Sequence, residues 1–140
     1  MKYILTIILA SLFLFSCDNS NDIDSFKSID VTEINKEIAT GIKNNEDWVM
    51  TPVSILNHIY RLQDTTETNG TYAIEQHENV GVLAITLTHE QIPDDSVYGE
   101  KRIIQFRQIN KSWTILSIKV GYKCYEGRGG HSNYCGEDCP

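Results

Sequence analysis

The second half of the chain contains four runs of residues that favour an extended backbone. They span residues 71–77, 80–88, 101–109 and 112–122. β-Branched and aromatic side chains recur in these runs, and such side chains suit the pleated, half-buried surface of a sheet. Only Asn110 and Lys111 separate the last two runs, so we expect a tight hairpin there. The sequence therefore predicts a four-stranded antiparallel meander.

The last run, 112–122, should direct its side chains alternately to the two faces of the sheet. One face would hold Leu116, Ile118 and Val120. The opposite face would hold Trp113, Ile115, Ser117 and Lys119.

A first helix is expected before the sheet. Asp30 and Glu33 have the spacing of a capping box, in which each side chain bonds to a backbone N–H of the first turn. An apolar stripe at helical spacing follows, formed by Ile34, Ile38 and Ile42. We expect this helix to end near Asn44 and Asn45, whose short polar side chains compete with helical hydrogen bonds.

A second helix should open at Thr51, with Pro52 in its first turn. Its apolar face consists of Val53, Leu56, Ile59, Tyr60 and Leu62. The polar run 64–70 should end it. The sequence thus predicts an α+β fold with two N-terminal helices packed on a curved four-stranded antiparallel sheet. Cystatin-like folds and the cones of the nuclear-transport-factor-like class are built this way, an analogy of fold that carries no function.

The N-terminus resembles an export signal. Lys2 precedes an almost wholly apolar stretch, 3–15, which is shorter than the ~20 residues of a transmembrane helix. The following Leu14-Phe15-Ser16-Cys17 resembles a bacterial lipobox. That resemblance implies a lipid on the Cys17 thiol and removal of the signal peptide, residues 1–16. An ordinary signal peptide with a chance cysteine is the alternative.

The expected organisation is a lipid-anchored tether, 17–29, followed by one α+β domain, 30–140. The net charge of −7 disfavours nucleic acid as a partner, because phosphates would be repelled. It also provides no polybasic patch for anionic lipid, so attachment would come from Cys17. We expect a bacterial cell-envelope location, with the outer membrane favoured, and another envelope protein as a partner.

The C-terminal tail, 123–140, is rich in glycine and cysteine. With Cys17 assigned to lipid, Cys124, Cys135 and Cys139 remain, which predicts a disulfide-closed loop and one leftover thiol. The spacing from Cys124 permits either downstream partner. A competing interpretation is a zinc site formed by Cys124, His131, Cys135 and Cys139.

Two segments offer candidate ligand-binding residues. Asp94 and Asp95 lie in the turn-like loop 89–96, where carboxylates can hold a cation or pin the loop to backbone N–H groups. Arg128 and His131 lie in the tail, where they can bind a ligand or satisfy buried carbonyls.

No catalytic residue can be assigned, since the chain has no Gly-x-Ser-x-Gly elbow and no phosphate-loop spacing. We therefore expect a non-enzymatic binding or interaction domain without a cofactor. The first alternative is a small-molecule or metal-binding domain that uses the Asp94/Asp95 loop or the Cys/His tail. The second is a hydrolase with an acid–base pair drawn from Asp94, Asp95 and His131.

Several motifs resemble those of a family of small exported bacterial proteins, many of them cyanobacterial, with no assigned function. They are Trp48-Val49 with Pro52, Asp94-Asp95-Ser96-Val97, Trp113, Cys124-x-x-Gly127-Arg128-Gly129, His131, Tyr134 and Cys139. The family pattern implies a Cys124–Cys139 disulfide and a free Cys135. Gly130 and Cys135 depart from that pattern.

Overall fold

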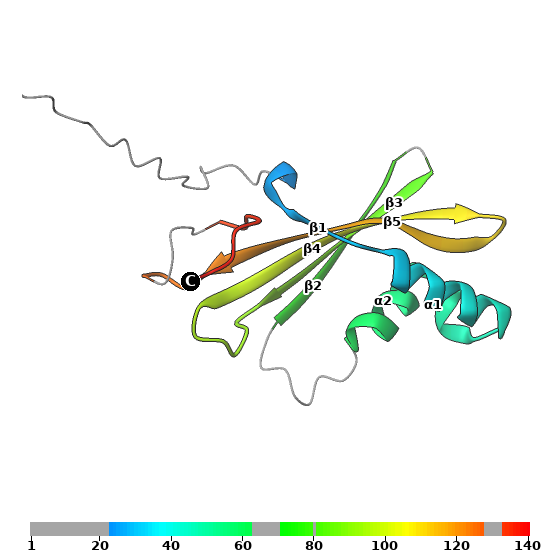
Figure 1. The fold of residues 1–140 in the computed structure, drawn as a ribbon, viewed down its shortest axis with the longest axis horizontal. Coiled ribbons are helices and arrows are strands. Elements are labelled where there is room, and N and C mark those ends of the chain that lie inside the picture. The colour runs from blue at the N-terminus through cyan, green and yellow to red at the C-terminus, as the bar shows by residue number, and fades with distance from the viewer. Residues whose placement is uncertain (1–22, 63–70, 80, 128–132) are drawn as a thin grey trace, which may run out of the picture.

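The structure is a computed structural model that describes residues 23–62, 71–79, 81–127 and 133–140. The expected signal peptide, Cys17, Arg128 and His131 lie outside these ranges. The α+β class is confirmed: two α-helices accompany one antiparallel sheet (Figure 1).

The sheet has five strands in the order β1-β5-β4-β3-β2. Their bounds are Lys27–Ile29 for β1, Thr71–Asn79 for β2, Val82–Glu90 for β3, Val97–Ile109 for β4 and Ser112–Cys124 for β5. Strands β2 to β5 correspond to the four predicted runs. The prediction of four strands was wrong by one, because β1 lies within the expected tether. Three residues carry no readable alternation, and β1 becomes a strand only by pairing with β5.

The predicted hairpin between β4 and β5 is confirmed. Asn110 and Lys111 have φ angles of 49° and 67°, the left-handed values that a two-residue turn between twisted strands requires. The two strands are each 13 residues long, so this hairpin forms the longest part of the sheet (Figure 1).

The first helix, α1, spans Thr32–Lys43 and lacks the predicted capping box. The Asp30 carboxylate instead accepts hydrogen bonds from the backbone N–H and the hydroxyl of Thr32, at 2.9 and 2.7 Å. Glu33 pairs with Lys36 at 2.6 Å. The box was wrong because the helix starts two residues after Asp30, which puts Asp30 outside the N-cap position. The helix ends as expected, with Asn44 as its C-cap.

The second helix, α2, spans Pro52–Tyr60 and begins as predicted. Thr51 is its N-cap, and Thr51 and Ser54 bond to each other's backbone N–H groups as a capping box. It ends at Arg61, which adopts a left-handed conformation. The short 3-10 helices η1, Ile23–Ser25, and η2, Asp47–Val49, complete the described elements.

The main core lies between these helices and one face of the sheet. It consists of Ile38, Val49, Ile55, Leu56, Ile85, Leu87, Ile104, Phe106, Ile115 and Ile118. The two helices lie toward one end of the sheet, and the strands continue past them (Figure 1). Part of the same sheet face therefore extends beyond its helical cover.

A β-bulge at Leu116 changes which side chains of β5 reach the core. The register passes from Gln105 opposite Ser117 to Phe106 opposite Ile115, which leaves Leu116 as an extra residue. Ile115 and Ile118 are both buried, whereas Leu116 is 37% exposed. The predicted grouping of Leu116 with Ile118 was wrong because a bulge interrupts strict alternation.

Asn35 of α1 anchors the helices to β5. Its side-chain amide donates to the carbonyl of Ile115 at 2.8 Å and accepts from the N–H of Ile115 at 3.0 Å. Strand β1 pairs with β5 only over residues 118–120. The Asn35 side chain thus bonds to the backbone of β5 beyond the end of β1.

Candidate functional site

A pocket of 330 Å³ lies where α2 ends and strands β3 and β4 continue. Its walls are formed by Tyr60, Leu62, Leu87, His89, Ile92, Glu100 and Arg102. Sheet register explains why four of these side chains meet. Leu87 lies opposite Arg102, and His89 lies opposite Glu100. Because alternate residues of a strand share a face, they continue the row of core residues that begins with Ile85 and Ile104.

Tyr60 and Leu62 bring the end of α2 to this pocket. The left-handed conformation of Arg61 ends the helix between them. Ile92 approaches from the loop that follows β3. The apolar wall thus comes from three separate segments, and the polar groups come from two adjacent strands.

A two-pronged ion pair forms the polar part of the pocket. Arg102 Nε lies 2.6 Å from Glu100 Oε1, and Arg102 Nη2 donates to Glu100 Oε2 at 2.8 Å. The two side chains are only 28% and 20% exposed. Their charges are therefore paired within the pocket and only partly accessible to water.

The ring of Tyr60 packs on this pair, with its centroid 4.5 Å from the guanidinium carbon of Arg102. Burial by itself would lower the pKa of Arg102, but the bonds to Glu100 and the proximity of Tyr60 raise the pKa overall. Burial also raises the pKa of Tyr60. Arg102 therefore stays charged and the Tyr60 hydroxyl stays protonated at neutral pH.

His89 contributes an uncharged polar group. Burial is the main cause that lowers the pKa of His89; Arg102 acts in the same direction and Glu100 opposes it. A pKa below the ordinary 6.5 leaves the imidazole neutral at pH 7. At that pH the described residues that line the pocket carry one positive and one negative charge, on Arg102 and Glu100, and these two charges pair with each other.

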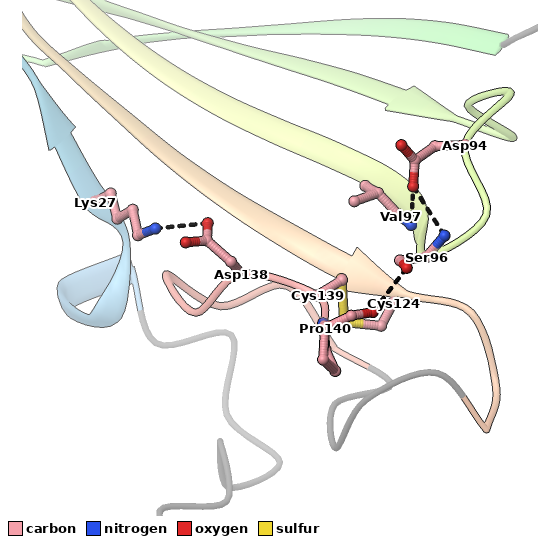
Figure 2. Close-up of a disulfide and its surroundings, with 8 residues drawn as sticks. All are labelled: Lys27, Asp94, Ser96, Val97, Cys124, Asp138, Cys139 and Pro140. Atoms are coloured by element: carbon pink, nitrogen blue, oxygen red, sulfur yellow. Dashed lines mark hydrogen bonds and ion pairs between the residues drawn. A yellow bond between two sulfur atoms is a disulfide. The ribbon is translucent and has the colours of Figure 1, made fainter.

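Asp94 takes the second of the roles considered for it, that of pinning its loop. One of its carboxylate oxygens accepts from the backbone N–H groups of Ser96 and Val97, each at 2.8 Å (Figure 2). These bonds, first that from Val97 and then that from Ser96, lower the pKa of Asp94. Asp95 is exposed in the same loop. Neither aspartate lines the pocket.

The tail is closed by the Cys124–Cys139 disulfide, as the family resemblance implies (Figure 2). Cys135 is also disulfide-bonded, so the expected free thiol was wrong. That expectation rested on a count of cysteines that set Cys17 aside for lipid. Because Cys124, Cys135 and Cys139 are all in disulfides, they do not supply thiolates for the zinc site considered above.

Further contacts attach the tail to the sheet. Tyr122 and Cys135 exchange two backbone hydrogen bonds, at 2.7 and 3.0 Å. At the very end, the Ser96 hydroxyl donates to the carbonyl of Pro140 at 2.7 Å, and Lys27 pairs with Asp138 at 2.6 Å (Figure 2). The described part of the tail therefore continues the sheet edge begun by β1.

Tyr134 packs against the opposite face of the sheet. Its hydroxyl donates to Glu90 at 2.9 Å, and Lys101 lies over its ring. Burial, followed by this bond, raises the pKa of Tyr134. A side chain at Gly99 would meet the Tyr134 hydroxyl at 2.8 Å, so the absence of a side chain there makes room for the tail.

None of the pocket residues was predicted from the sequence as a site residue. His89 and Ile92 fell within the loop 89–96, where only Asp94 and Asp95 were singled out, and Glu100 and Arg102 were passed over. A signal was present, since strict alternation places both on the face of β4 that carries Ile104 and Phe106. Charged residues on a core-facing row indicate either a buried pair or a site.

Comparisons of the chain with protein-family models, with curated proteins and with solved structures found no match. The part of the chain that the structure describes contains no cluster of three or more His, Cys, Asp or Glu side chains able to hold a metal ion. Within the same ranges, no helix is long and apolar enough to cross a membrane.

Proposed function

We propose that this chain is an exported, lipid-anchored binding domain that holds a small molecule in the pocket between α2 and strands β3 and β4. The observation that carries the proposal is the convergence of His89, Glu100 and Arg102 on a cavity walled by Leu62, Leu87 and Ile92. Ligand sites in proteins typically combine apolar walls with a few placed polar groups. At 330 Å³ the cavity lies at the lower end of the usual range for such sites, about 300–1,000 Å³.

The lipobox-like segment at Cys17 supports the anchored location. The described fold begins at Ile23, and six further residues can extend a chain by at most about 20 Å. The binding domain would then stay close to the membrane surface. The net negative charge of the chain disfavours electrostatic binding to anionic lipid headgroups and is compatible with attachment through a lipid bound covalently to Cys17.

A fragment screen followed by NMR of the mature protein tests the binding function. We expect a subset of small fragments to shift the resonances of Leu62, Leu87 and His89. A Leu62→Trp variant, which fills the cavity, should lose these shifts. A Leu116→Trp variant, changed at an exposed position of β5, should keep them. Fragments that bind only outside the pocket, or equally to both variants, would refute the proposal.

A protein partner on strand β2 is a second candidate. Strand β2 is an edge of the sheet, its described side chains 73–79 are all exposed, and Ile74 is 42% exposed. An edge strand can pair with an extended segment of another protein. Glu75 and Glu78 favour a basic segment.

A photo-crosslinker tests this second candidate. Placed at Ile74, but not at Leu116, it should capture a specific envelope protein in cells. Equal labelling from both positions would count against a partner on strand β2.

A further inference from the structure

The charges of the pocket limit what it can bind. The Arg102 guanidinium and the Glu100 carboxylate meet through two short contacts, at 2.6 and 2.8 Å. The ring of Tyr60 covers one face of the guanidinium. Among the residues that the structure describes, no other charged side chain lines the pocket. A bound anion would be repelled by Glu100, and a bound cation would be repelled by Arg102. Because these two charges already pair with each other, neither ion would find an unpaired charge of opposite sign.

The apolar wall makes this balance more restrictive. Leu62, Leu87 and Ile92 lie beside the ion pair, and Leu87 is only 4% exposed. A ligand that enters the pocket loses part of its hydration, and an ion that is desolvated without a partner loses much more free energy than an uncharged polar group. Uncharged acceptors and donors can still bond, because Arg102 has five N–H groups and Glu100 engages only part of them.

From these observations we infer that the ligand is an uncharged small molecule with an apolar body and a hydrogen-bonding head, such as an amide or an alcohol. The body would pack against Leu62, Leu87 and Ile92. The head would reach Arg102, Tyr60 and His89. This inference rests on the proposed function, since it names the class of ligand for the same pocket.

Three probes of one shape test the ligand class. Cyclohexanecarboxamide, cyclohexanecarboxylate and cyclohexylmethylammonium share a ring and differ in the charge of the head. NMR titrations of the full mature protein at pH 7.5 should show that the amide binds the pocket at least tenfold more tightly than either ion. If the carboxylate or the ammonium binds the wild-type pocket best, the ligand class is overturned while the binding function stands. If none of the three shifts the pocket resonances, the proposed function itself fails for ligands of this size.

Two variants that break the ion pair from opposite sides make the test specific. Glu100→Gln leaves Arg102 without its anion and should shift the preference toward the carboxylate by about tenfold or more. Arg102→Met leaves Glu100 without its cation and should shift the preference toward the ammonium. If one variant does not fold, the other still gives a signed prediction. Preferences unchanged in a folded variant would show that the ion pair does not select the ligand.

Discussion

Asn35 illustrates how much one polar side chain can decide at the residue scale. It is a half-buried residue of a helix, yet its amide makes the two hydrogen bonds to the backbone of Ile115 that a neighbouring strand would otherwise make. The Thr114 hydroxyl also donates to the same Asn35 oxygen, at 3.1 Å. The side chain thus serves three groups of β5 and sets the position of α1 on the sheet.

Replacing Asn35 should destabilise the fold. An Asn35→Ala change leaves the N–H and C=O of Ile115 without these bonds, and an unsatisfied buried polar group costs roughly 1–3 kcal/mol. Urea unfolding should show a lower midpoint with an unchanged slope. Lys36→Ala, an exposed neighbour on α1, is the control and should change the free energy of unfolding by less than about 0.5 kcal/mol. An Asn35→Ala protein as stable as this control would contradict the anchoring role.

His89 should make stability depend on pH. Because burial lowers the pKa of His89 in the folded chain, the unfolded chain takes up the proton at a higher pH. The free energy of unfolding should therefore be highest above pH 6.5 and fall as the pH drops from 6.5 toward the lowered pKa. Between pH 7.5 and 5, urea midpoints should fall more for the wild type than for His89→Gln. Identical pH dependence of the two proteins would mean that His89 is not desolvated.

At the scale of single elements, pairing between strands overrides local pattern twice. Strand β1 has only three residues and exists through its contacts with β5. In β5 itself, the extra residue Leu116 lets Ile115 and Ile118 both enter the core. Helix α2 behaves in the opposite way, because its cap and its proline are local and make its start readable from the sequence alone.

The β4–β5 hairpin offers a stabilising substitution. Lys111 has a φ of 67°, a conformation that costs roughly 1–2 kcal/mol for a residue with a side chain and that glycine adopts freely. Lys111→Gly should therefore raise the free energy of unfolding by up to about 1 kcal/mol, after the greater flexibility of glycine in the unfolded chain is subtracted. Lys111→Ala keeps the Cβ atom and should give no such gain. Equal effects of the two substitutions on the melting temperature would contradict this account of the turn.

The tail joins distant parts of the molecule. The Cys124–Cys139 disulfide, the Ser96–Pro140 bond and the Lys27–Asp138 pair link the end of the chain to β5, to the loop before β4 and to β1 (Figure 2). These contacts define the end of the sheet that the helices do not cover.

Removing the disulfide should weaken the whole domain. A Cys124→Ser, Cys139→Ser double variant opens a loop with a sequence separation of 15, and closure of such a loop contributes roughly 3 kcal/mol. Urea unfolding measures the loss. Tyr125→Ala, changed at an exposed position beside Cys124, should have a much smaller effect. An unchanged midpoint in the double variant would show that the tail contributes little to stability.

Lipidation should be detectable on the whole protein. The chain has four cysteines, and Cys124 and Cys139 form a disulfide with each other. We expect envelope-purified protein to incorporate labelled fatty acid. Cys17→Ala should lose the fatty-acid label. A label retained by Cys17→Ala, or an unlabelled wild type, would refute the lipoprotein assignment.

The sequence by itself determined what depends on neighbouring residues. It predicted the α+β class, strands β2 to β5, the turn at Asn110 and Lys111, and the start of α2 at Thr51 and Pro52. Each of these follows from backbone preferences and capping groups that act over a few residues, and such preferences hold wherever the segment lies in the fold.

Only the tertiary structure decided the features that need partners distant in sequence. Strand β1, the bulge at Leu116 and the disulfide state of Cys135 all depend on which segments lie side by side. The pocket is the clearest case, because Tyr60, His89 and Arg102 come from three elements and meet only through sheet register and the end of α2. A charged pair on a core-facing row can be seen in the sequence, but whether helices cover it or leave it open is settled by packing.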